Sequence, residues 1–118
     1  MRSYTSLEQS KKLAEILPIE SADMAWYSSY AKDGYTIRML NNTYPLDIIG
    51  EEHDEIPCWS LSALLDIIPY PTLCKHANKT WSCASWVKKI NPYFVKSCDN
   101  PINACVDMII KLHEEKLL

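Results

Sequence analysis

The chain has 118 residues, a length that supports one hydrophobic core and falls short of two ordinary domains. Hydrophobic residues make up 47% and charged residues 23%, which excludes a disordered chain, and the net charge of -3 argues against a broad nucleic-acid footprint. Only two glycines are present, Gly34 and Gly50, which argues against a glycine-rich phosphate-binding loop.

The first predicted element is a helix that begins near Thr5. Thr5-Ser6-Leu7-Glu8 fits a capping box, in which threonine and glutamate satisfy each other's main-chain amides. Apolar residues then recur at helical spacing as far as Pro18, which pushes the residue before it out of the α region. This stripe consists of Leu7, Leu13, Ala14, Ile16 and Leu17.

Two strands are predicted next, over residues 24–30 and 35–39, joined by a turn at Asp33-Gly34. Asp-Gly supplies the positive φ that a tight hairpin requires. Alternation puts Arg38 on the face opposite Ile37. Within the ambiguous stretch 41–57, residues 44–49 leave two interpretations open, a short edge strand or an ordered loop, and loops of this length are often functional.

Ser60 is predicted to cap a second helix over residues 61–68. A second strand pair follows, over residues 72–76 and 80–87, with a turn in which Asn78 tolerates the left-handed conformation. Residues 88–99 are predicted as a connection.

The last predicted helix begins after Asp99 or Asn100, either of which fits the cap. Pro101 follows at the first turn, where its missing amide costs nothing. An apolar stripe is expected to face the core, formed by Ile102, Cys105, Val106, Ile109 and Leu112.

The order helix, hairpin, helix, hairpin, helix predicts a single α+β domain over residues 1–118. We expect an antiparallel sheet of about four strands with the helices packed on one face. The ends of the first two helices, Glu15-Ile16-Leu17-Pro18 and Asp66-Ile67-Ile68-Pro69, are alike. Diverged duplication and chance both explain so short a match.

Three segments carry a family resemblance. They are Leu7-Glu8-Gln9-Ser10-Lys11-Lys12-Leu13-Ala14-Glu15-Ile16-Leu17-Pro18, Pro57-Cys58-Trp59-Ser60-Leu61-Ser62-Ala63-Leu64-Leu65 and Asn100-Pro101-Ile102-Asn103-Ala104-Cys105-Val106-Asp107-Met108-Ile109-Ile110-Lys111-Leu112. They resemble uncharacterised short proteins encoded by bacteriophages, prophages and mobile elements of gut anaerobic bacteria. The resemblance covers most of the chain in outline and implies a small soluble accessory protein. The group has no established function, so no catalytic or ligand residues carry over.

An uncovered sheet face is the leading candidate site. Trp81 and Cys83 belong to the predicted core face of their strand, so Trp86 lies on the opposite face, beside Arg38 if the two hairpins share a sheet. Tryptophan, tyrosine and arginine on such a face resemble interface hot spots. The candidate binding residues are Trp86, Arg38, Tyr27 and Trp59. Packing is the alternative for the two tryptophans: Trp86 as a half-buried residue under a loop, and Trp59 as a residue that packs against the helix it precedes.

Other chemistry has little support in the residues. The five cysteines form no close pair, which indicates free thiols in a cytosolic chain, and Cys74-x-His76 with Cys83 and Cys98 departs from the tighter spacing of structural zinc sites. No catalytic constellation, metal site or cofactor is therefore expected. The acidic run Glu51-Glu52-His53-Asp54-Glu55 is interpreted as a solvated loop, with a decoy for a basic surface or a weak divalent-ion site as alternatives.

These observations favour a protein-binding module. We expect it to be cytoplasmic, because no apolar run has the roughly 18–20 residues of a membrane span and the opening residues lack a signal peptide. The resemblance implies a host or phage protein as partner, and modulation of a host defence protein as one such role. A homodimer through the aromatic face is a further arrangement. The alternative function is nucleotide or nucleic-acid binding, with Arg38, Lys75, Lys79, Lys88 or Lys89 near phosphate.

Overall fold

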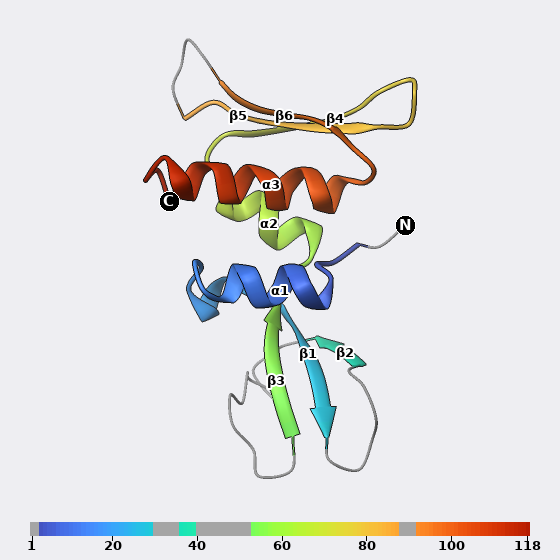
Figure 1. The fold of residues 1–118 in the computed structure, drawn as a ribbon, viewed down its shortest axis with the longest axis vertical. Helices are drawn as coiled ribbons and strands as arrows, with labels where there is room; N and C mark the ends of the chain where they lie inside the picture. Colours follow the sequence, from blue (N-terminus) through green and yellow to red (C-terminus); the bar gives the residue numbers. More distant parts are fainter. Residues whose placement is uncertain (1–2, 30–35, 40–52, 88–91) are drawn as a thin grey trace.

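The computed structural model describes residues 3–29, 36–39, 53–87 and 92–118 (Figure 1). The described elements are α1 (Leu7–Ala14), a 3-10 turn (Ile19–Ser21), β1 (Met24–Ser29), β2 (Thr36–Met39), β3 (His53–Cys58), α2 (Leu61–Ile67), β4 (Pro71–Lys75), β5 (Trp81–Ser85), β6 (Tyr93–Cys98) and α3 (Pro101–Glu114). The α+β class is confirmed. None of the described helices has the length and apolar content of a membrane-spanning segment.

The described strands form two antiparallel sheets of three strands each, ordered β2-β1-β3 and β4-β5-β6. This corrects the expectation of one sheet of about four strands. The third strand of each sheet lies where the sequence has no clear alternation. β3 occupies the end of the ambiguous segment 41–57, whose other residues lie outside the described part, and β6 occupies the predicted connection 88–99. Pro57 and the charged residues before it hide β3 from pattern analysis.

The sheets differ in connectivity, although each follows one helix. In the first sheet the first strand, β1, is central, whereas in the second sheet the second strand, β5, is central. A duplicated unit would keep the same strand in the middle. The alike ends of α1 and α2 are therefore not accompanied by a repeated sheet topology.

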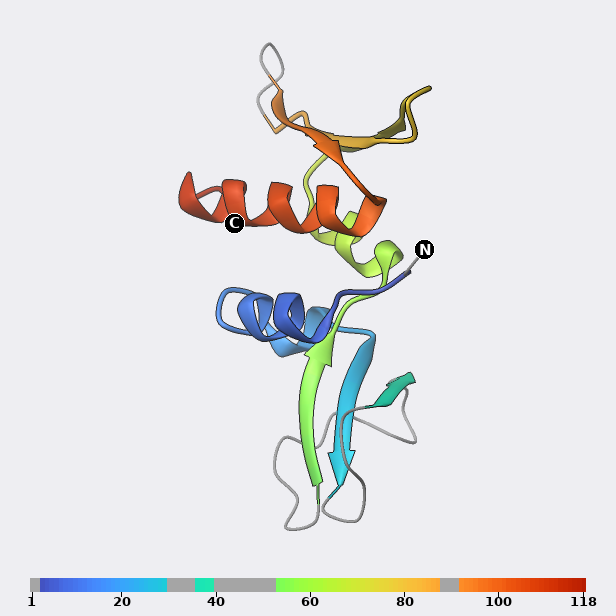
Figure 2. The same cartoon turned by 45° about the vertical axis from the view of Figure 1, so that its right-hand side comes forward.

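The helices form a layer between the two sheets, as Figures 1 and 2 both show. α3 packs on β5 and β6, α2 packs on α3, and α1 contacts α3 and β3. The sheet β2-β1-β3 projects from this layer, which gives the molecule extents of 50 × 30 × 23 Å. The helices thus cover one face of the sheet β4-β5-β6.

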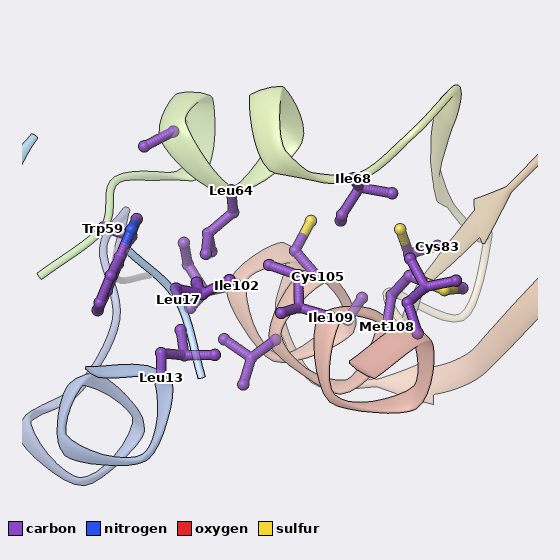
Figure 3. Packing of buried hydrophobic residues seen from close by; sticks show 14 residues of the cluster. Leu13, Leu17, Trp59, Leu64, Ile68, Cys83, Ile102, Cys105, Met108 and Ile109 are labelled. Atoms are coloured by element: carbon purple, nitrogen blue, oxygen red, sulfur yellow. The ribbon is translucent and has the colours of Figure 1, made fainter. Parts of the chain in front are cut away.

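The hydrophobic core lies within the helix layer and against β5 (Figure 3). All five residues of the predicted α3 stripe are buried, which confirms that prediction. Trp59, Leu13 and Leu64 are among the largest side chains with no exposed surface. Trp59 also donates its indole N–H to Ser21 Oγ over 2.9 Å, so its one polar atom is paired inside the protein.

The helix caps follow the sequence with one shift at α1. Ser6, not Thr5, is the N-cap: its hydroxyl accepts from Gln9 N at 3.1 Å, and Gln9 Oε1 accepts from Ser6 N at 2.9 Å. This is a complete capping box one residue later than predicted. Ser60 caps α2 as predicted, and Asn100 caps α3.

Thr5 is buried instead, because it joins the opening segment to the end of β3. Its main-chain N–H donates to Trp59 O at 2.9 Å, and its carbonyl accepts the indole N–H of Trp26 at 3.2 Å. Tyr4 and Ser60 form an isolated β-bridge beside it. Thr5 is therefore part of the interior.

The β4–β5 hairpin turns through residues 77–79, as predicted. The left-handed residue is Lys79, with φ 67°, and not Asn78. Lys79 N donates to His76 O, while the side chain of Asn78 accepts from both the N–H and the hydroxyl of Thr80. Asn78 thus stabilises the turn through its side chain, which leaves the positive φ to the last loop residue.

Candidate functional site

The face of β4-β5-β6 that is turned away from α3 is the candidate site, and we call it the outer face. Residues opposite one another in an antiparallel pair share a face. Cys83 pairs with Leu73 and Val95, and all three belong to the core or pack against it. Ala84, which pairs with Thr72 and Phe94, therefore lies on the outer face, and Ser82 and Cys74 lie there as the next pair.

Large aromatic side chains are exposed on and beside this face. Phe94 is 41% exposed, and Trp86, two residues beyond Ala84, is 42% exposed. Tyr70 directly precedes β4, is 74% exposed, and accepts the main-chain N–H of Trp86 at 3.1 Å. Aromatic residues from all three strand regions therefore meet solvent at one sheet.

Hydrogen bonds orient the polar atoms of the outer face. The indole N–H of Trp86 donates to Thr72 Oγ1 over 3.1 Å, and His76 Nε2 lies 2.9 Å from Ser82 Oγ. Each bond joins the region of the edge strand β4 to that of the central strand β5. The small residues Ser82 and Ala84 on the central strand are buried between the larger groups. Trp86 is consequently held by a bond as well as by packing, and its ring still meets solvent.

Trp86 and Arg38 are not brought together. Arg38 belongs to β2 and pairs with Ala25 in the other sheet, so the premise of one shared sheet fails. The side chain of Arg38 lies outside the described part of the chain. Tyr27 belongs to the same sheet as Arg38, opposite Thr36 and Glu55, and is half-buried.

Trp59 is wholly buried, which corrects its place among the candidate binding residues and supports its packing role. Phe94 and Tyr70 are the residues that sequence reasoning missed. Phe94 belongs to Tyr-Phe-Val, a segment without alternation of polar and apolar residues, for which the sequence predicts a connection. Tyr70 stands between two prolines, where a pattern analysis assigns only the end of a helix.

Of the lysines expected near phosphate, the structure describes Lys75 and Lys79. Lys75 pairs with Trp81 on the core side of the sheet, and its Nζ lies 5.8 Å from the centroid of the Trp81 ring. Lys79 is in the hairpin turn, and Lys88 and Lys89 lie outside the described residues. Among the described basic side chains, His76 is the one that strand pairing or a hydrogen bond places on the outer face.

The cysteines are free thiols in different environments. Cys58, Cys83 and Cys105 are buried, and Cys74 is exposed on the outer face. Burial raises the pKa of the Cys58 thiol, and the neighbouring Cys83 thiol together with burial raises the pKa of Cys105. Burial and the charge of Asp107 raise the pKa of Cys98. None of these three is an activated nucleophile.

Side chains alternate along a strand, so Cys74 and Cys83 lie on opposite faces of the sheet. The residues considered as zinc ligands in the sequence therefore do not lie together. Within the described residues, no group of three or more His, Cys, Asp and Glu side chains is arranged to hold a metal ion. The acidic run is only partly described. Glu55 lies in β3 and is buried, which corrects its interpretation as part of a solvated loop.

Two hollows lie away from the outer face. One, of about 270 Å³, is lined by Tyr4, Ser6, Glu8, Gln9, Asn100 and Asn103 among others; the other, of about 400 Å³, is lined by residues that include Glu20, Asp23 and Asp66. Some of the polar groups at each hollow are already used in the fold. Gln9 Nε2 donates to Asn103 Oδ1 at 2.7 Å, and the Asp23 carboxylate accepts from the N–H and the hydroxyl of Ser60.

Comparison with family models, with curated proteins and with solved structures gives no match for this chain. The function is therefore argued from the outer face and its chemistry. Tyr70, Trp86 and Phe94, with the bond that holds Trp86, are the observations that such an argument uses.

Proposed function

We propose that this protein is a small protein-binding module whose contact surface is the outer face of β4-β5-β6. The observation that supports the proposal is the exposure of Tyr70, Trp86 and Phe94 at one sheet whose other face is covered by α3. The motif resemblance to phage and mobile-element proteins suggests a host or phage protein as partner, with the cytosol of the host cell as the place of binding and a defence protein as one target.

Aromatic side chains favour this assignment on energetic grounds. Tryptophan and tyrosine dominate binding energies at protein interfaces, and they bury a large area while losing little conformational freedom. The indole of Trp86 is already fixed by Thr72, so part of the ordering cost of binding is met in the free protein. An exposed tryptophan held in place is thus suited to be the anchor of an interface.

Nucleotide or nucleic-acid binding through the same rings is the second candidate, because aromatic planes also stack bases. Phosphate requires cations beside the rings, and Lys75 is engaged with Trp81 on the opposite side of the sheet. The charge of -3 also opposes a polyanion. We therefore rank this function below protein binding.

The test is affinity capture of the tagged full chain from host cytosol, with and without nuclease and at two salt concentrations. We expect a stoichiometric protein partner that survives nuclease and is lost with Trp86→Ala. The matched control is Met39→Ala, since Met39 is 57% exposed but belongs to the other sheet. Retention by Met39→Ala and loss by Trp86→Ala, with both variants melting near the parent temperature, would support the outer face.

Two results would count against the proposal. Capture that is equal in Trp86→Ala and Met39→Ala would remove the outer face as the contact surface. Material that disappears with nuclease, or that weakens steeply as salt rises, would favour the nucleic-acid function instead.

A further inference from the structure

The free edge of β4 has a defined pattern of main-chain groups. Trp86 N donates to Tyr70 O, and His76 N donates to Thr80 O, so the hydrogen-bonded pairs of the β4–β5 ladder include 70/86 and 76/80. Hydrogen-bonded and non-hydrogen-bonded pairs alternate in an antiparallel ladder. Residues 72 and 74 therefore bond to β5, and residues 71, 73 and 75 direct their main-chain groups away from it.

Leu73 and Lys75 thus present two N–H and two C=O groups at the open edge. β4 pairs with β5 alone, and the described structure contains no hydrogen bond from these outward groups to another element. Pro71 contributes a carbonyl but has no N–H. Four of the five residues of β4 are exposed, the exception being the half-buried Leu73, whose side chain packs against the core.

The opposite edge of the same sheet, formed by β6, differs because a side chain covers part of it. By the same alternation the main-chain groups of Phe94 point away from β5, and its carbonyl accepts the ammonium of Lys111 at 3.2 Å. A lysine from α3 therefore covers part of the β6 edge. This is one of the devices by which proteins block strand edges, and no hydrogen bond among the described residues covers the β4 edge in this way.

We propose that β4 is the interface for a second copy of this chain, with the two β4 strands antiparallel about a two-fold axis at Cys74. This arrangement pairs Leu73 with Lys75 of the second copy, and Lys75 with Leu73. Each pair exchanges two hydrogen bonds, so the four outward groups of Leu73 and Lys75 in each copy are satisfied. The result is one six-stranded sheet, β6-β5-β4 from each copy.

The alternative register, with the axis at Leu73, is poorer. It places Lys75 opposite Pro71 of the second copy, and the carbonyl of Lys75 then has no N–H to accept because proline lacks one. The axis at Cys74 pairs both groups of Lys75, and the carbonyl left outside these pairs is that of Pro71, at the end of the strand. In this register each Lys75 lies opposite Leu73 of the second copy, and each ammonium stays over its own Trp81 ring.

A second copy fits this edge better than a foreign segment on two grounds. An isologous interface uses one surface twice, and β4 is complementary to itself about Cys74. Its strand is already extended in the folded chain, so pairing requires no ordering of a flexible peptide. The inference uses the edge of the sheet and not the outer face, so it stands apart from the proposed function.

Cys74 supplies the test. Residues directly opposite in a non-hydrogen-bonded pair have Cα atoms about 4.5 Å apart, within the range of a disulfide. Diamide would take two electrons and two protons from the two thiols, and an S–S bond would form. We expect a covalent dimer of twice the 13.6 kDa chain, lost in Cys74→Ser and retained in Cys98→Ser.

Two further variants separate this register from random collision. Thr72→Cys in a Cys74→Ser background puts the thiol opposite residue 76 of the second copy, so cross-linking should be roughly tenfold slower. Lys75→Pro removes an outward N–H without removing a bond of the β4–β5 ladder. It should shift the reduced protein from dimer to monomer in light scattering, whereas Lys75→Ala should remain dimeric.

A monomeric mass for the reduced parent chain would overturn the proposal, as would equal cross-linking through residues 72 and 74. A dimer that survives Lys75→Pro would place the interface elsewhere. Loss of partner capture in Trp86→Ala does not bear on these results, and a monomeric chain that still captures its partner would refute the dimer alone.

Discussion

The hydroxyl of Thr5 lies 3.3 Å from the thiol of Cys58, across 53 positions of sequence. The same hydroxyl lies 2.7 Å from Ser10 Oγ and accepts the main-chain N–H of Trp59 at 3.2 Å. All four residues have no exposed surface. One side-chain oxygen therefore joins α1 to the junction of β3 and α2.

Replacing that oxygen by a methyl group should be costly. Thr5→Val keeps the shape but leaves the buried N–H of Trp59 and the hydroxyl of Ser10 without this partner, which should lower the free energy of unfolding by about 1–3 kcal/mol. Urea unfolding followed by circular dichroism measures the change. Thr80→Val is the matched control, because its hydroxyl bonds to Asn78 at the surface. Equal effects of the two substitutions would contradict the role of Thr5.

The two tryptophans Trp59 and Trp86 should respond differently to truncation. Trp59→Ala empties a fully buried site and removes the bond to Ser21, so it should lower the free energy of unfolding by about 3–5 kcal/mol. Trp86→Ala should cost about 1 kcal/mol or less because the ring is 42% exposed. Thermal unfolding of both variants checks the difference. A large loss with Trp86→Ala would return that residue to the core.

Stability should fall in alkali because two buried thiols resist ionisation. Burial raises the pKa of Cys58, and the contact with Cys83 together with burial raises that of Cys105, from the ordinary value of 9.0. Below pH 9.0 both states keep the thiol protons, so stability is complete. As the pH rises from there toward the folded pKa values, the unfolded chain releases protons that the folded chain retains. Each thiol then changes the unfolding constant about tenfold per pH unit.

Denaturant unfolding at a series of pH values above 9 measures this effect. Cys58→Ala removes a thiol whose pKa is raised by burial and should make the decline shallower than in the parent chain. A decline as steep as that of the parent chain would assign the alkaline loss to other groups.

The cap of α3 should contribute measurably. Asn100 Oδ1 accepts the main-chain N–H of Asn103 at 2.8 Å, so Asn100→Ala should lower the free energy of unfolding by about 1 kcal/mol. Asn100→Asp should restore most of it, since aspartate is an equally good cap. Chemical denaturation compares the three proteins, and an Ala variant as stable as the parent would show that the cap is dispensable.

The helices could be predicted from the sequence because their signals are local. Pro101 after a capping asparagine and a stripe such as Ile102, Val106 and Ile109 fix the start and the buried face of α3 together. Even so, the sequence predicts the cap of α1 one residue too early. Thr5 and Ser6 carry the same chemistry, and only tertiary contacts determine that Thr5 is buried among Ser10 and Cys58.

The sheets could be predicted only in part because strand pairing is set at long range. The sequence predicts β1, β2, β4 and β5 through turns and alternation, but β3 and β6 lack such patterns and are fixed by their partners. The candidate site could likewise be predicted only where local signals were enough. Exposure of Trp86 was predictable from alternation within β5, whereas its separation from Arg38 depends on there being two sheets.

The contact between Lys111 and Phe94 limits how the molecule assembles. A sheet with two open edges adds copies without end and grows into a fibre. Lys111 covers part of the β6 edge, so the proposed pairing through β4 leaves no fully open edge of this sheet in either copy. Under that proposal we expect association through this sheet to stop at two chains, with the Lys111 ammonium limiting further growth.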